Sequence, residues 1–121
     1  MQSLAWSHPG SGPTGRKWWS FRSIVRSNSL PGLRGVYCIF QRTPSRYRTI
    51  WVGQGSIAER LAVHTRERSI SARPYLLVTW AETDPSQTDG IEKYLIDTLH
   101  PLEGERAPEA EPIAVNLPYP L

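Results

Sequence analysis

The fold is decided by residues 35–68, which read GVYCIFQRTPSRYRTIWVGQGSIAERLAVHTRER. Within this stretch, residues 35–41 and 48–54 are rich in β-branched and aromatic side chains, a composition that predicts two strands. The residues between them include Thr, Pro and Ser, which favour a turn. The sequence therefore predicts an antiparallel hairpin.

Side chains alternate between the two faces of a strand, so the first strand of this hairpin should have two distinct faces. Val36, Cys38 and Phe40 should lie on one face, and Tyr37 and Ile39 on the other. Tyr37 is then held on a rigid strand in a defined direction, which is what a catalytic side chain requires.

Two helices and a third strand are expected after the hairpin. Ser56 followed three residues later by Glu59 is a capping box, which predicts a helix over residues 56–68. Residues 75–81 are predicted as a strand, and residues 86–100 as a helix that a following proline ends. This order predicts an α+β fold, a small three-stranded antiparallel sheet flanked by helices.

The 121 residues suffice for one domain with a modest core. Residues 1–15 are predicted to be a disordered N-terminal segment, and residues 32–121 to be the folded domain with a Pro- and Glu-rich C-terminal tail. Residues 16–31 are expected to form either a basic-aromatic arm or a short helix.

The segment 16–22 alternates cations with aromatic side chains, and its cations are Arg16, Lys17 and Arg22. As an arm, it would stack on bases and pair with phosphates, so these three cations are candidate substrate-binding residues. As a helix, it would pack Trp18, Phe21 and Val25 on the core. We favour the helix because large aromatic side chains are usually buried.

The charge of the chain is unevenly distributed. Residues 1–74 carry twelve basic against two acidic residues, a net charge of +10, whereas residues 75–121 carry two against nine, a net charge of −7. This asymmetry favours a protein that binds a polyanion with one face. The single cysteine, Cys38, cannot form an internal disulfide and indicates a cytoplasmic setting. No apolar run approaches the ~20 residues of a membrane span, so no membrane association is expected.

Glu92 is the most informative position on physical grounds. In the predicted second helix it lies within an apolar stripe formed by Ile91, Leu95, Ile96 and Leu99. A carboxylate in such a place must be compensated by a cation, because its desolvation is costly. A divalent metal ion and an ion pair with Arg60 are the two alternatives.

The order of Gly35-Val36-Tyr37, Trp51-Val52-Gly53, Arg60, His64, Glu92 and Asn116 resembles that of the GIY-YIG nuclease superfamily. The resemblance implies that Glu92 is the metal ligand, for Mg²⁺ or Mn²⁺, and that Arg60 stabilises the charge that develops on phosphorus. It also implies that Tyr37 lies beside the attacking water and that Asn116 braces the site. Gly53 is implied as a backbone position close to the substrate.

Three of these positions, and Gln54 beside them, can also be interpreted in other ways. Trp51 stands where the family usually has tyrosine, and its indole cannot abstract or relay a proton, although it can still contact the substrate. His64 shares a predicted helix face with Arg60 and serves either in proton transfer or as an ordinary surface residue. Asn116 is either a brace or a turn residue. Gln54 is expected to contact a phosphate, although the glycine-rich turn around it is a common feature.

The sequence thus predicts a metal-dependent endonuclease that hydrolyses phosphodiester bonds in DNA, with RNA left open as a substrate. Dimerisation, the N-terminal basic-aromatic arm or a targeting partner protein would supply any sequence preference, because no helix-turn-helix or zinc module is recognisable in the sequence. Two rivals remain: a nucleic-acid-binding module without catalysis, favoured by Trp51, and a partner-docking domain, favoured by the acidic, proline-rich tail.

Overall fold

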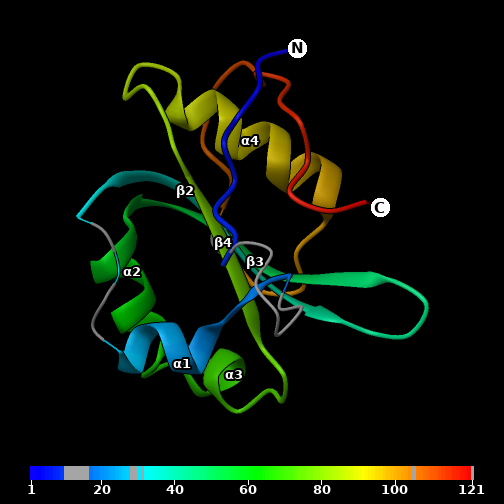
Figure 1. Cartoon of the computed structure of the whole chain (residues 1–121). Helices are drawn as coiled ribbons and strands as arrows, with labels where there is room; N and C mark the ends of the chain where they lie inside the picture. The colour runs from blue at the N-terminus through cyan, green and yellow to red at the C-terminus, as the bar shows by residue number, and fades with distance from the viewer. Residues whose placement is uncertain (10–16, 28–29, 31, 105, 121) are drawn as a thin grey trace.

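The computed structural model describes residues 1–9, 17–27, 30, 32–104 and 106–120. In this part of the chain an antiparallel sheet with the strand order β1-β4-β2-β3 is flanked by helices, so the α+β class is confirmed (Figure 1). The elements in chain order are β1 (Trp19–Ser20), α1 (Phe21–Arg26), β2 (Arg34–Arg42), β3 (Tyr47–Ser56), α2 (Ile57–His64), α3 (Arg68–Ser71), β4 (Leu77–Glu82) and α4 (Thr88–Leu99).

The described sheet has four strands, whereas the sequence predicts three. The additional strand is β1, in which Trp19 and Ser20 pair with Val78 and Leu77 of β4. Two residues are too few to show the alternation by which a strand is recognised in a sequence. Ser20 also accepts a hydrogen bond from the backbone N–H of Ser23 and so caps α1. The sequence at this point therefore indicates the start of a helix and gives no sign of a strand.

The central hairpin is confirmed. Strands β2 and β3 pair antiparallel, with Tyr37 opposite Gly53, and the register shifts at Ile39/Phe40. The predicted alternation is also correct, because the two sets of side chains from β2 lie in two separate cores.

Each face of the sheet carries one of these cores (Figure 1). Helix α4 packs with both terminal segments on the face that receives Val36, Cys38 and Phe40. Helices α1, α2 and α3 pack on the opposite face, which receives Tyr37 and Ile39. Strand β3 is last in the strand order, so residues from both layers can approach one another around it.

The N-terminal segment departs from the prediction. Leu4 and Trp6 are buried, and the backbone N–H of Ser7 donates a hydrogen bond to the carbonyl oxygen of Trp80. The prediction of disorder is therefore wrong for residues 1–9, because two apolar side chains complete the core beside α4. Residues 10–15 lie outside the described part of the chain.

The predicted helices are shorter in the structure. The helix expected over residues 56–68 ends at His64, and the separate turn α3 follows it. Ser56 occupies the N-cap of α2 without a side-chain cap bond, so the capping box is not formed. Instead, the backbone N–H of Ile57 donates to the carbonyl oxygen of Leu33. The second predicted helix corresponds to α4.

The segment before the hairpin is partly the predicted short helix. Phe21 and Ile24 are the buried residues of α1, whereas Trp18 lies in the core on the opposite face of the sheet. The stripe expected for Trp18, Phe21 and Val25 is therefore wrong, because β1 separates Trp18 from the helix. None of the helices in the described residues has the length and apolarity to span a bilayer.

Candidate active site

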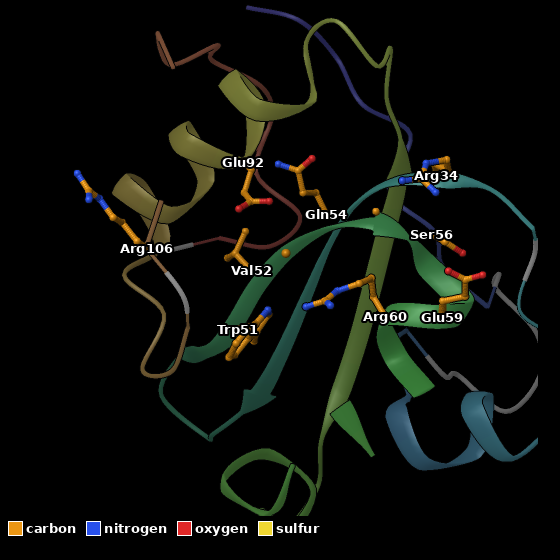
Figure 2. A pocket seen from close by; sticks show the side chains of 11 residues that line it. Arg34, Trp51, Val52, Gln54, Ser56, Glu59, Arg60, Glu92 and Arg106 are labelled. Atoms are coloured by element: carbon orange, nitrogen blue, oxygen red, sulfur yellow. The ribbon is translucent and has the colours of Figure 1, made fainter. Parts of the chain in front are cut away.

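A polar cavity of about 360 Å³ opens along strand β3, where α2 and α4 approach it from either side (Figure 2). Its lining comprises Arg34, Trp51, Val52, Gly53, Gln54, Gly55, Ser56, Glu59, Arg60, Glu92 and Arg106. It thus brings together Trp51, Gly53, Gln54, Arg60 and Glu92 from the residues that the sequence indicates.

Glu92 and Arg60 meet in this cavity although they belong to opposite layers of the fold. Helix α2 follows β3 directly, so Arg60 lies one turn beyond the end of the strand. Helix α4 is joined to the same strand by a hydrogen bond of 2.7 Å from Nε2 of Gln54 to Oδ1 of Asp89. Figure 2 shows the Glu92 carboxylate and the Arg60 guanidinium directed toward the space between the two helices. Glu92 as a residue is 8% exposed, in agreement with its predicted place in an apolar stripe.

Gly53 is required because the ring of Tyr37 crosses it. The two residues are opposite one another in the hairpin, and a Cβ added to Gly53 would lie 2.5 Å from Cζ of Tyr37. The missing side chain lets the phenol reach across β3 toward the cavity. Gly53 is therefore needed to make room for the side chain of Tyr37, whether or not a substrate also approaches its backbone.

Tyr37 is hydrogen-bonded to His64 inside the protein. The phenol oxygen lies 2.6 Å from Nε2 of His64, and neither side chain is exposed. The edge of Trp51 packs against the imidazole, with ring centroids 4.7 Å apart. On the other side of the ring, Nδ1 lies 3.0 Å from a carboxylate oxygen of Glu67, which is 35% exposed. His64 is therefore a buried partner of Tyr37, and its interpretation as an ordinary surface residue is wrong.

Burial raises the pKa of Tyr37 to about 12, because the phenolate would lose its hydration. Hydrogen bonding and the positive charge of Arg60, together with a hydrogen bond from Trp51, lower this pKa, and the charge of Glu92 raises it slightly. Desolvation thus outweighs the influence of the nearby arginine on the pKa of the phenol. Tyr37 is a neutral phenol at physiological pH.

This pKa predicts a specific loss of stability in alkali. The folded chain holds the phenol proton more tightly than the unfolded chain, so the contribution is complete below pH ~10 and is lost as pH rises toward 12. The free energy of unfolding of the wild type should fall more steeply over this range than that of Tyr37→Phe, by up to about 2–3 kcal/mol. Urea titrations between pH 8 and pH 11.5 measure the difference. Parallel curves would contradict the burial of the phenol.

The residues at the cavity fit a magnesium site with one protein carboxylate. Mg²⁺ keeps several waters and is commonly held by one or two carboxylates together with substrate phosphates. Glu92 offers a buried carboxylate that faces a polar space large enough for such waters. Among the described residues, no group of three or more His, Cys, Asp or Glu side chains could hold a metal ion. Glu92 is the buried carboxylate of the cavity, whereas Glu59 is exposed, so a metal ion held by Glu92 would take most of its other ligands from water and the substrate.

Three residues predicted from the sequence lie elsewhere. Asn116 accepts a hydrogen bond from the backbone N–H of Leu4 and donates one to the carbonyl oxygen of the same residue, so it holds the N-terminal segment and does not brace the cavity. Arg22 donates to the carbonyl oxygens of Ser71 and Arg73 and thereby caps α3. Lys17 is exposed, with its ammonium over the ring of Trp18.

The assignment of these residues to the site came from sequence order, which does not fix their three-dimensional neighbours. Asn116 is the clearest case, because its partner Leu4 is 112 residues away in the chain. Arg16, the remaining cation of the predicted arm, lies outside the described residues.

Several cavity residues were not predicted as site residues, among them Arg34, Ser56, Glu59 and Arg106. Arg34 had a usable signal, because it is a cation directly before the predicted strand 35–41. In the structure it is the first residue of β2 and pairs with Ser56, the last residue of β3. Arg106 comes from the tail and forms an ion pair with Glu109, and its side chain is directed away from Glu92 in Figure 2. Arg34 extends the positive charge of Arg60 to the rim of the cavity.

No protein-family model, curated protein or solved structure matches this chain. The resemblance to the GIY-YIG superfamily therefore remains an interpretation of the residues and their arrangement.

Proposed function

We propose that this protein is a metal-dependent endonuclease of the GIY-YIG type that hydrolyses phosphodiester bonds in DNA. The observation that carries the proposal is the convergence of Glu92 and Arg60 on one polar cavity, beside the buried pair of Tyr37 and His64. These residues come from helices and strands on both faces of the sheet. Their convergence on one cavity is therefore not explained by the packing of a single core or by the exposure of a single surface.

Arg60 would bind the scissile phosphate. A guanidinium can hold two phosphate oxygens through parallel hydrogen bonds, and it stays charged at every working pH. Negative charge builds on these oxygens in the transition state, and a preorganised cation in a partly desolvated cavity stabilises that charge. Arg34 also lines the cavity, and we expect its guanidinium to contact a neighbouring phosphate of the same strand.

Glu92 would hold the magnesium or manganese ion. Such an ion supplies positive charge to the scissile phosphate and its leaving oxygen when it is bound. The carboxylate is fixed for this purpose by α4, whose buried neighbours Ile91 and Leu95 anchor the helix on the sheet.

Tyr37 and His64 accept the proton of the attacking water. As the water oxygen bonds to phosphorus, its proton passes to the phenol oxygen while the phenol proton passes to Nε2 of His64. Phenolate is not needed at any step, so the raised pKa of Tyr37 is compatible with catalysis. Since Tyr37 has no exposed surface, this step requires a side-chain movement at the cavity wall that admits water to the phenol oxygen.

The test is cleavage of supercoiled plasmid and of labelled RNA, with magnesium or with a chelator. We expect metal-dependent cleavage of DNA, and we expect Arg60→Lys to lower the rate by about 10²-fold or more, because the bidentate contact is lost while the charge stays. Arg66→Lys is the matched control, since Arg66 is exposed just beyond the end of α2 and does not line the cavity. Equal rates for the two variants would contradict the role of Arg60.

The rival functions give different results in the same samples. A binding module without catalysis would bind DNA with a log–log salt slope of about −0.9 for each neutralised phosphate and would cleave nothing. A partner-docking domain would show neither cleavage nor salt-dependent binding.

A further inference from the structure

The contact of Glu67 with His64 has no part in the roles assigned above. Glu67 lies between α2 and α3, and a carboxylate oxygen is 3.0 Å from Nδ1 of the buried imidazole. The other ring nitrogen, Nε2, faces the phenol of Tyr37. Glu67, His64 and Tyr37 thus form a row. Tyr37, at one end, packs against Gly53 in the wall of the cavity, and Glu67, at the other end, is partly exposed to solvent.

The position of Glu67 in the chain favours this contact over a local role. Glu67 is the N-cap of α3, a position where Ser, Thr, Asp and Asn are preferred, and its side chain makes no cap hydrogen bond. Its backbone is nevertheless fixed: its carbonyl oxygen accepts hydrogen bonds from Ile70 and Ser71, and its N–H donates to His64. The side chain is thus held in reach of the imidazole by a short, well-bonded connection.

A carboxylate beside one nitrogen decides where a neutral imidazole carries its proton. Neutral histidine has one N–H and one lone pair, and a negative oxygen 3.0 Å from Nδ1 favours the proton at Nδ1. Nε2 is then an acceptor, so the phenol of Tyr37 must donate its proton to it. The lone pairs of the phenol oxygen are left to accept a proton from water.

We propose that Glu67 is a positioning residue that keeps the proton of His64 on Nδ1 and so keeps Nε2 open to the Tyr37 proton. When His64 receives that proton, Glu67 stabilises the resulting imidazolium, and the Nδ1 proton can leave along the exposed carboxylate to water. The position of the proton on His64 does not depend on the proposed nuclease function. Only the expected effect of Glu67 on cleavage rests on that function.

The ring contacts of His64 with Trp51 and Tyr37 do not select the nitrogen that carries this proton. Trp51 packs an uncharged ring edge against it, and Tyr37 can either donate or accept. Arg60, one turn earlier on α2, has N–H donors only and so offers no acceptor for a ring proton. Glu67 therefore provides the negative charge that selects between the two tautomers.

The tautomer can be measured directly in the metal-free protein. Two-dimensional ¹⁵N–¹H spectra that detect long-range couplings in the ring should show His64 with its proton on Nδ1 in the wild type. Glu67→Ala should shift it substantially to Nε2. Glu67→Gln should retain the Nδ1 proton, because an amide oxygen in the same place can also accept a proton from Nδ1. A proton that stays on Nδ1 in Glu67→Ala would overturn the proposal.

Cleavage provides the second measurement. Glu67→Ala should lower the single-turnover rate by about 10–100-fold, with Glu67→Gln between it and the wild type and with DNA affinity unchanged. Glu103→Ala is the matched control, because Glu103 is 34% exposed, has a cationic neighbour in Arg73 and lies outside the cavity. A full rate in Glu67→Ala would overturn the proposal. If the wild type itself cleaves nothing, the nuclease function fails, and the spectra alone decide the role of Glu67.

Discussion

Glu92→Gln is expected to abolish metal-dependent cleavage and to leave the fold and the affinity for DNA nearly intact. Glutamine keeps the size of the side chain and removes the charge that a hard cation requires. Glu92 is 8% exposed, so replacement of its carboxylate by a neutral amide also relieves a desolvation cost. The free energy of unfolding without metal should therefore stay level or rise slightly.

Single-turnover cleavage, a DNA-binding titration and urea unfolding together check this expectation. Asp97→Asn is the matched control: it removes a carboxylate from the same helix, but Asp97 is 48% exposed and forms a surface pair with Lys93. Its effect on stability should be within ~0.5 kcal/mol, and its effect on cleavage negligible.

A different result for Glu92→Gln would support the structural alternative that the sequence left open. If the variant loses ~3–5 kcal/mol of stability, Glu92 is one half of a buried ion pair with Arg60, because removal of one partner leaves a buried charge uncompensated. Retained cleavage would contradict the role of Glu92 as metal ligand.

The parts of the fold that the sequence predicts correctly are those encoded by local patterns. Alternation in β2 assigns Val36 and Tyr37 to opposite faces, and the helical period assigns Glu92 to the buried side of α4. These patterns repeat within a few residues, so neighbouring positions support one another.

The parts that the sequence does not predict depend on contacts between distant segments. Leu4 is buried because α4 and the tail leave room for it, and Asn116 is directed to Leu4 by the same packing. His64 is buried against Tyr37, whose ring passes over Gly53, and the sequence pattern of α2 does not indicate that contact. The candidate site is thus predictable as a set of residue types, whereas the partner of each side chain is not.

Gly53→Ala tests the contact on which the site is built. The new methyl group would lie 2.5 Å from Cζ of Tyr37, whose ring is fully buried and has no space to retreat. Overpacking of this kind costs about 1–3 kcal/mol, and more where both neighbours are rigid. We expect a loss of stability in this range, together with a displaced phenol, a broken hydrogen bond to His64 and loss of cleavage.

Gly32→Ala is the control, because a Cβ at Gly32 meets nothing within 4 Å. It should change the free energy of unfolding by no more than ~0.5 kcal/mol. Tyr37→Phe removes the phenol oxygen, which is the atom closest to the added methyl group. In a double-mutant cycle measured by urea unfolding, the loss caused by Gly53→Ala should therefore be smaller in the Tyr37→Phe background. Equal losses in the two backgrounds would mean that the ring atoms Cζ and Cε1, which phenylalanine keeps, account for the whole clash. A Gly53→Ala protein as stable as Gly32→Ala would mean that Tyr37 does not cross β3 at Gly53, and Tyr37 would then no longer connect Glu67 and His64 to the cavity.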